Sequence, residues 1–135
     1  MEDKEKKTIL VIDDDDDVLF LIGYALKHLG IETECTTTGT EGLERYRQKI
    51  EERRPFAAVI ADLSLPGNLG ARELIVPLLS LNPSAKVFVT SGYSDDPALT
   101  NFKALGFTGA LPKPITVEML REMVLPLLED PAGLP

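Results

Sequence analysis

The chain lacks several features that would assign it to a particular class of protein. Cys35 is its only cysteine, so no internal disulfide can form, and we expect a reducing, cytoplasmic setting in which Cys35 is a small core residue. The formal net charge of -8 argues against a nucleic-acid surface, which needs clustered Lys and Arg. We expect no secretory signal in residues 1–12, and no apolar run is long enough to predict insertion into a membrane.

What the sequence does contain is the composition of one soluble domain. Of its 135 residues, 44% are hydrophobic and 27% are charged. A chain of this length can bury about two-thirds of the surface that its unfolded form exposes. We predict one folded domain over residues 1–130, and a C-terminal tail or the start of a linker at residues 131–135.

Short apolar runs alternate five times with stretches of helical periodicity. This alternation is typical of an α/β protein built on a parallel sheet. The predicted strands are residues 8–12, 32–36, 56–61, 86–90 and 108–111. The first predicted helix has an apolar stripe made of Val18, Leu21, Ile22, Ala25, Leu26 and Leu29. We expect this stripe to be buried against the sheet.

Prolines should alter two of the later helices, and a third has few apolar residues to anchor it. The third helix is predicted over residues 71–81, where Pro77 should kink or shorten it. Pro126 should likewise end or bend the last helix early. The fourth helix, predicted from Asp96-Pro97 to Leu105, has few apolar residues, so we expect it to be weakly anchored.

Four separated positions carry reactive or charged side chains directly after an apolar run. Asp13-Asp14 follow the first predicted strand, and Asp62 follows the third. Ser91 follows the fourth, and Lys113-Pro114 follow the fifth. The carboxyl ends of parallel strands meet in one crevice, so these residues can converge although they are distant in sequence.

The predicted site has the groups that phosphoryl transfer requires. Three carboxylates about 4 Å apart would repel one another by roughly 4 kcal/mol a pair, which favours a bound Mg²⁺ or Mn²⁺. Asp62 is the expected nucleophile because it stands alone after the most apolar strand. Lys113 and Ser91 would hold the phosphoryl oxygens, and Ser91 is preferred to Thr90 because neighbouring strand residues point to opposite faces. Movement of Ser91 toward the phosphoryl group would shift residues 92–96 and the fourth helix.

These residues stand in segments that resemble the receiver domain of bacterial response regulators and hybrid histidine kinases. The matching segments are ILVIDD at 9–14, VIADLSLPG at 59–67, VTSGY at 89–93 and LPKP at 111–114. They occur in the family's order and spacing, and the resemblance covers almost the whole chain. It implies a flavodoxin-like (βα)5 three-layer sandwich with strand order 2-1-3-4-5, and a cis Lys113-Pro114 bond.

The resemblance also implies a function. The implied ligands of Mg²⁺ are Asp13, Asp14, Asp62 and the Ser64 carbonyl. A histidine kinase or phosphotransfer protein would donate a phosphoryl group to Asp62. The signal would then pass to a downstream effector protein or a linked domain through the Ser91–Tyr93 loop and the fourth helix. Such a domain is a self-dephosphorylating switch and not a turnover enzyme.

The fifth strand departs from the family's pattern. Many receivers carry an aromatic switch residue on the fifth strand, where this chain has Ala110. We therefore expect the output to depend on the loop around Tyr93. Ser64 and Tyr93 flank the expected path of water to the acyl phosphate, so we predict that they set its lifetime.

Other interpretations fit some of the same residues. Residues 15–17 are predicted to serve only a helix N-terminus, and His28 only a helix C-terminus. An aspartyl-phosphate phosphatase would place a second aspartate where this chain has Ser64. A degenerate receiver that acts only as a protein-binding module would have lost Asp62, Lys113 or one of the acid pair, and all are present.

Overall fold

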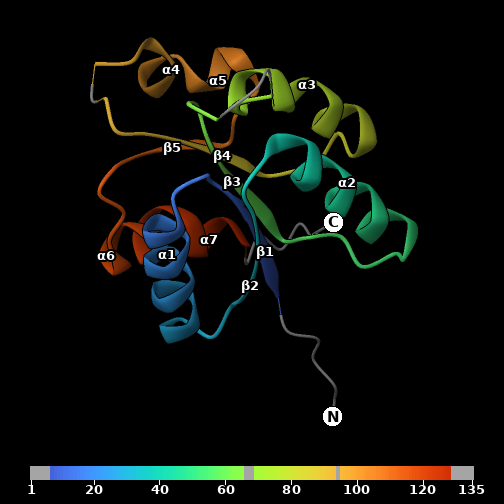
Figure 1. The fold of residues 1–135 in the computed structure, drawn as a ribbon, viewed down its shortest axis with the longest axis horizontal. Helices are drawn as coiled ribbons and strands as arrows, with labels where there is room; N and C mark the ends of the chain where they lie inside the picture. Colours follow the sequence, from blue (N-terminus) through green and yellow to red (C-terminus); the bar gives the residue numbers. More distant parts are fainter. Residues whose placement is uncertain (1–6, 66–68, 94, 129–135) are drawn as a thin grey trace.

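The fold is a five-stranded parallel sheet with helices on both faces (Figure 1). We describe it from a computed structural model, which defines residues 7–65, 69–93 and 95–128. The strand order is β2-β1-β3-β4-β5, so the predicted flavodoxin-like order is confirmed. The strands are β1 Thr8–Ile12, β2 Glu32–Thr36, β3 Ala58–Asp62, β4 Val87–Ser91 and β5 Gly109–Pro112.

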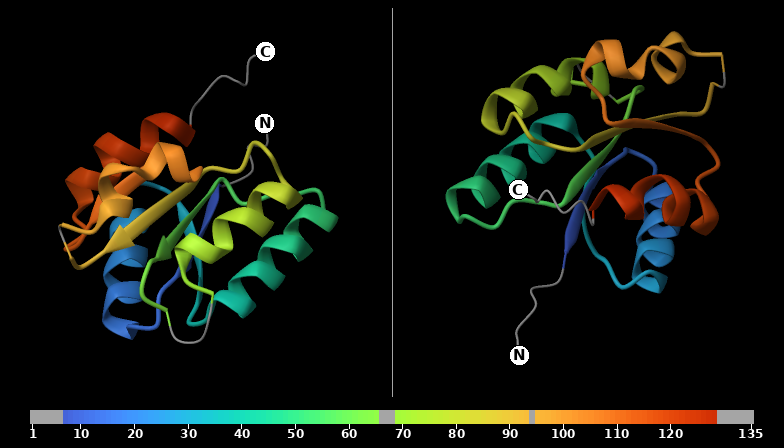
Figure 2. Two further views of the ribbon diagram at one scale, coloured as in Figure 1. Left: turned by 90° about the horizontal axis from the view of Figure 1, so that it is seen from above. Right: turned by 180° about the vertical axis from the view of Figure 1, so that it is seen from behind.

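The helices form two layers, one on each face of the sheet (Figure 2). They are α1 Asp16–His28, α2 Gly39–Glu51, α3 Ala71–Leu81, α4 Pro97–Thr100, α5 Phe102–Leu105, α6 Val117–Met119, the π-helical turn η1 Leu120–Val124 and α7 Leu125–Leu128. One face is covered by α1 together with the continuous α6, η1 and α7 segment. The other face is covered mainly by α2 and α3. Within the described residues, no helix has both the length and the apolar character needed to cross a bilayer.

Side chains along the central strands point alternately to the two faces of the sheet, so each strand contributes to both layers of the core. In β1, Ile9 and Val11 pack with α1, whereas Leu10 and Ile12 pack on the opposite face with α2 and α3. Every residue of β3 and β4 is buried, which explains why both read as continuous apolar runs. The polar residues that end these two strands, Asp62 in β3 and Ser91 in β4, are therefore held at the ends of fully buried strands.

Two residues predicted for the core are exposed instead. Leu21 is 58% exposed, because the buried stripe of α1 is centred on Leu19, Ile22 and Leu26, and Leu21 points away from it. Cys35 is also exposed, because β2 is an edge strand with a polar sequence and only partial cover.

The later helices differ from the predicted ones for local reasons. The fourth helix is divided into α4 and α5 at Asn101, and Asp96 caps the first piece by accepting from the Ala98 N–H at 3.0 Å. Pro77 lies within α3 and does not shorten it. The last helix continues past Pro126, and η1 precedes the proline. A wider π-turn suits this position because proline cannot donate a backbone hydrogen bond.

The limits of the remaining elements agree with the sequence within one or two residues. β3 begins at Ala58 and not at residue 56, because Phe56 turns inward to pack on the Tyr46 ring, 6.0 Å between centroids. β4 and β5 each begin and end one residue later than predicted. The predicted tail at residues 131–135 lies outside the described residues, as do residues 66–68 and 94 of the predicted loops.

Two glycines inside helices provide a matched test of the packing between α2 and β1. We expect Gly23→Ala to stabilise the fold by about 0.5–1 kcal/mol, because glycine weakens a helix and the nearest atom to an added Cβ is Thr33 Oγ1 at 4.0 Å. At Gly42 the same Cβ would lie 2.8 Å from Cγ1 of Ile12, which is fully buried and cannot move aside. We expect Gly42→Ala to cost about 1–3 kcal/mol in denaturant unfolding. Equal stabilisation by both variants would contradict this packing.

Candidate functional site

The carboxyl edge of the sheet gathers the polar residues predicted from the sequence. Ile12 of β1 pairs with Ala61 of β3, so Asp13 reaches the same level as Asp62. Ser91 pairs with Pro112 across β4 and β5, which places Lys113 one residue further along the same edge.

The Lys113 ammonium lies between two buried carboxylates. Its Nζ is 2.9 Å from Asp13 Oδ2 and 3.2 Å from Asp62 Oδ2. Asp13 is only 2% exposed and Asp62 only 5%. The peptide bond between Lys113 and Pro114 is cis, as the resemblance implied. One cation thus bridges carboxylates from β3 and from the end of β1.

A third carboxylate completes an oxygen-lined cluster. Asp13, Asp14 and Asp62 each offer a carboxylate oxygen, and the three atoms lie within 4.8 Å of one another. Asp14 is exposed, so the cluster is open on one side. Backbone N–H groups hold the inner acids in place: Asp15 donates to Asp13 Oδ1 at 2.9 Å, and Ser64 donates to Asp62 Oδ1 at 3.3 Å. Hard oxygen donors with an open side fit Mg²⁺ or Mn²⁺, which keep several waters when bound.

Electrostatics in the cluster favour added positive charge. Burial, followed by the charge of Asp13, raises the pKa of Asp62, and Lys113 offsets only part of this effect. Burial alone would lower the pKa of Lys113, but the bond to Asp13 and the charge of Asp62 outweigh it and raise that pKa. The lysine therefore stays an ammonium, while the aspartate is held in a site that penalises its charge.

Ser91 connects the site to a surface loop. Its hydroxyl oxygen accepts a hydrogen bond from the Tyr93 N–H at 3.0 Å, and its carbonyl accepts one from the Lys113 N–H at 2.9 Å. Both Ser91 and Thr90 are buried, whereas Tyr93 is 68% exposed. A movement of the Ser91 hydroxyl would therefore displace the backbone that presents Tyr93.

The other singled-out residues lie outside this cluster. Ala110 is buried in β5 beside Val89, and no ring occupies its place. Asp15 caps α1 by accepting from the Asp17 N–H at 2.9 Å, as expected of a helix N-terminus. His28 ends α1, where its ring contacts Tyr24 at 4.8 Å between centroids.

The structure adds an apolar surface beside the site that the sequence analysis missed. Val18 and Leu21 of α1 line a hollow of about 360 Å³ with Lys113, Pro114 and three further residues. Next to it on α1, Phe20 and Tyr24 are 70% and 57% exposed and stack four residues apart. In the sequence, this surface could have been recognised from two aromatic residues four positions apart that lie outside the buried stripe of α1.

The family of the chain follows from its match to a known domain. Residues 9–125 match the response regulator receiver domain. The chain belongs to this family. The receiver is 26% identical over 114 residues to a response regulator receiver protein of Anaeromyxobacter sp. (strain Fw109-5). That match covers 84% of the chain and 45% of the relative, so the chain spans about half the length of this protein.

Solved structures of the same family superpose on the receiver. One is a response regulator receiver domain protein from Clostridium thermocellum, with a TM-score of 0.82, 26% identity and coverage of 96% of this chain and 99% of that one. Another is a CheY-like receiver protein from Methanospirillum hungatei JF-1, with a TM-score of 0.79, 27% identity and coverage of 96% and 98%. A third, from Burkholderia pseudomallei, carries a phosphorylated aspartic acid, a calcium ion and citrate; its TM-score is 0.74 at 26% identity, covering 95% and 72%.

We expect the charge on Asp62 to destabilise the metal-free receiver. Because the folded-state pKa of this acid is raised, stability falls as the pH rises through that pKa. In EDTA at pH 7.5, Asp62→Asn should raise the midpoint of thermal unfolding, by about 3 °C for a domain of this size. The gain should shrink as the pH is lowered toward that pKa. Asp95→Asn, at an exposed position, is the control, and a lower midpoint for Asp62→Asn would refute the account.

Proposed function

We propose that the receiver accepts a phosphoryl group on Asp62 from a partner's phosphohistidine and changes its protein contacts in response. The observation that carries this proposal is the Lys113 ammonium 3.2 Å from the Asp62 carboxylate, beside the acid pair. An Asp62 oxygen attacks phosphorus, the phosphorus–nitrogen bond breaks, and its electron pair returns to the donor imidazole. A histidine kinase or phosphotransfer protein is the donor, and the receiver is a switch and not a turnover enzyme.

Different residues of the site have different roles in the transfer. Asp13, Asp14, Asp62 and the Ser64 carbonyl would hold a Mg²⁺ ion, which when bound would supply positive charge to neutralise the incoming group. Lys113, already bonded to Asp62, exchanges one carboxylate contact for a phosphoryl oxygen. The transferred group is mainly positioned and neutralised, because its transition state has little covalent chemistry for the protein to perform.

The Ser91 hydroxyl converts the new charge into a movement. In the structure this hydroxyl oxygen accepts from the Tyr93 N–H. Turning the hydroxyl to donate to a phosphoryl oxygen would draw the loop that carries Tyr93 toward the site. With Ala110 on β5 there is no ring to move inward, so the Tyr93 loop and α4 present the signal to an effector protein or a linked domain in the cytoplasm.

The relatives and the surface beside the site support this proposal. The structure of a response regulator protein from Burkholderia pseudomallei contains a phosphorylated aspartic acid and a calcium ion. The exposed apolar residues on α1 adjoin the hollow next to Lys113, which gives a donor protein a surface to contact as it delivers its phosphoryl group.

Phosphorylation can be tested with a small phosphodonor such as acetyl phosphate. With Mg²⁺, we expect the intact mass to increase by one phosphoryl group, and EDTA should prevent this. Asp62→Asn should abolish the gain, whereas Asp95→Asn, an exposed acid outside the cluster, should leave it unchanged. Persistent labelling of the Asp62→Asn variant would overturn the proposal.

The lifetime of the phosphoryl group should depend on two side chains at the path of water. Tyr93→Ala removes bulk and should speed hydrolysis, whereas Ser64→Gln adds bulk and should slow it. We expect changes of about threefold or more, which correspond to roughly 0.7 kcal/mol in the barrier. Loss of the phosphoryl group from isolated protein, followed over time by mass, measures this. Unchanged rates in both variants would remove these residues from the mechanism.

A further inference from the structure

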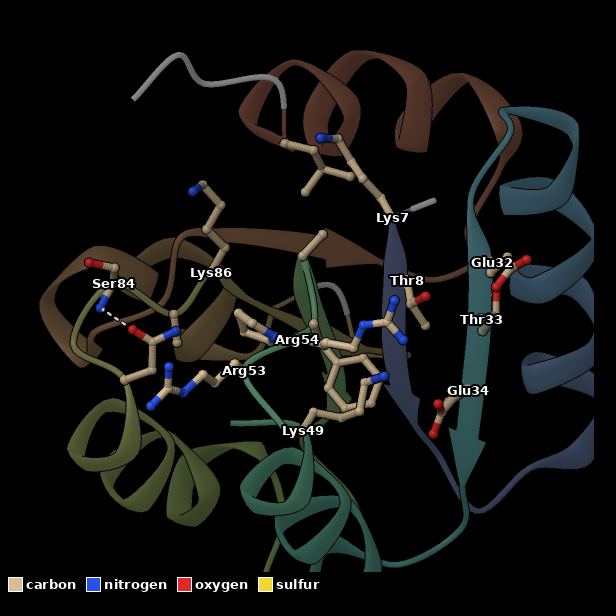
Figure 3. Close-up of a pocket in the computed structure, with 16 residues that line it drawn as sticks. Lys7, Thr8, Glu32, Thr33, Glu34, Lys49, Arg53, Arg54, Ser84 and Lys86 are labelled. Carbon is tan, nitrogen blue, oxygen red and sulfur yellow. Dashed lines mark hydrogen bonds between the residues drawn. The ribbon is translucent and has the colours of Figure 1, made fainter. Parts of the chain in front are cut away.

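A second hollow lies at the amino edge of the sheet, at the opposite end of the strands from Asp62 (Figure 3). Its volume is about 710 Å³, which is in the range of small-molecule sites. Five of the 14 Lys and Arg residues of this acidic chain line it: Lys7, Lys49, Arg53, Arg54 and Lys86. They come from separate segments and surround one concave space.

Within the part of the chain that the structure describes, three of these cations have no acidic partner. Among the described residues, no carboxylate lies within ion-pair distance of Lys7, Arg53 or Lys86. Of the two glutamates on the β2 side of the hollow, Glu34 is already bound by Arg45 through two hydrogen bonds of 2.9 and 2.8 Å. Among the described residues, five cations and two glutamates line the hollow, so positive charge is in excess there.

Two of the cations lie on neighbouring parts of the sheet. Lys7 precedes β1 and Lys86 precedes β4, with β3 between the two strands. Adjacent strands are about 4.8 Å apart, so the row spans roughly 10 Å. That length exceeds a single phosphate and is comparable to a chain of two or three linked phosphates. Lys49 also lines the hollow, and its ammonium lies 5.8 Å from the centre of the buried Phe56 ring.

The position of Arg53 indicates that its charge matters. α2 ends with the Arg53 N–H bonded to the Ile50 carbonyl and the Arg54 N–H bonded to the Lys49 carbonyl, both at 3.0 Å. This geometry places Arg53 in the left-handed region, with φ 63°. α1 and α5 end in the same way but have glycine at this position. The helix end alone would favour glycine, so the arginine side chain serves something other than the backbone.

The geometry points to a binding site for a small anion with two or more linked phosphates, held in this hollow by Lys7, Arg53 and Lys86. A concave space reached by cations from several segments suits a compact polyanion better than an extended acidic peptide, which would need a groove or a flat stripe. The site does not depend on phosphotransfer, because none of its cations contacts the Asp62 cluster.

The test uses tripolyphosphate as the probe, with EDTA present so that no metal-bound phosphate enters the Asp62 cluster. Calorimetric titration should show binding that weakens as salt is added, and amide resonances of Thr8, Arg53 and Lys86 should shift in NMR spectra. Lys86→Gln should weaken binding about tenfold, since it removes one charge-assisted contact. Lys103→Gln changes an exposed cation of α5 that does not line the hollow, so it should leave the affinity unchanged.

The Arg53→Gly variant separates the effect of a lost charge on binding from any effect on stability. This variant should bind about tenfold more weakly, while its thermal midpoint should be no lower than that of wild type, because glycine is favoured at this backbone angle. Asp62→Asn should bind as wild type does, so a failure here is distinct from a failure of phosphorylation.

Three outcomes would overturn the assignment. One is no binding of tripolyphosphate at millimolar concentration. Another is wild-type affinity in both Arg53→Gly and Lys86→Gln. The third is tighter binding of a hexaglutamate peptide than of tripolyphosphate, which would assign the hollow to an acidic protein segment instead.

Discussion

The receiver's site depends on one ammonium group shared by two buried carboxylates. Lys113 binds Asp13 and Asp62 at the edge where the parallel strands end, and both acids are almost inaccessible to water. With Asp14 the cluster contains three carboxylates and one ammonium, so it remains short of positive charge. Lysine alone can hold the apo site together, but it cannot neutralise it. That shortage is why the cluster could hold a divalent ion, and it underlies the phosphoryl transfer that we propose.

The same residues connect the chemistry to the surface through a short path. Ser91 is bonded to the backbone of Lys113 on one side and of Tyr93 on the other. Further along the loop, Asp96 caps α4, and its carboxylate lies 3.8 Å from the Arg72 guanidinium of α3. α4 is a single turn, so few contacts resist its movement. Because Ala110 on β5 provides no ring to move, the response that we propose would fall on the exposed Tyr93 loop.

The sequence predicted the fold and the convergence of the site because both depend on local patterns with a fixed geometric meaning. An apolar run that ends in Asp62 or Ser91 is a buried strand whose last residue must lie at the carboxyl edge. Predictions failed where the outcome depends on what covers a surface. Leu21 has helical spacing but points away from the sheet, and Cys35 lies on an uncovered edge strand. The cations of the amino edge could not be found in the same way, because in sequence they are scattered among acids.

The acidic cluster and the cations of the amino edge lie at opposite ends of the strands, which limits how binding at one edge can affect the other. Strands of four or five residues place the carboxyl and amino edges about 16 Å apart. At that distance two unit charges interact by only about 1 kcal/mol at an effective dielectric near 20, so charge added at Asp62 has a weak effect on Arg53 or Lys86. Any stronger coupling between the edges would have to be mechanical, and the fully buried central strands that join them leave little room for movement. The sheet thus holds two oppositely charged edges that can bind anions of different kinds independently.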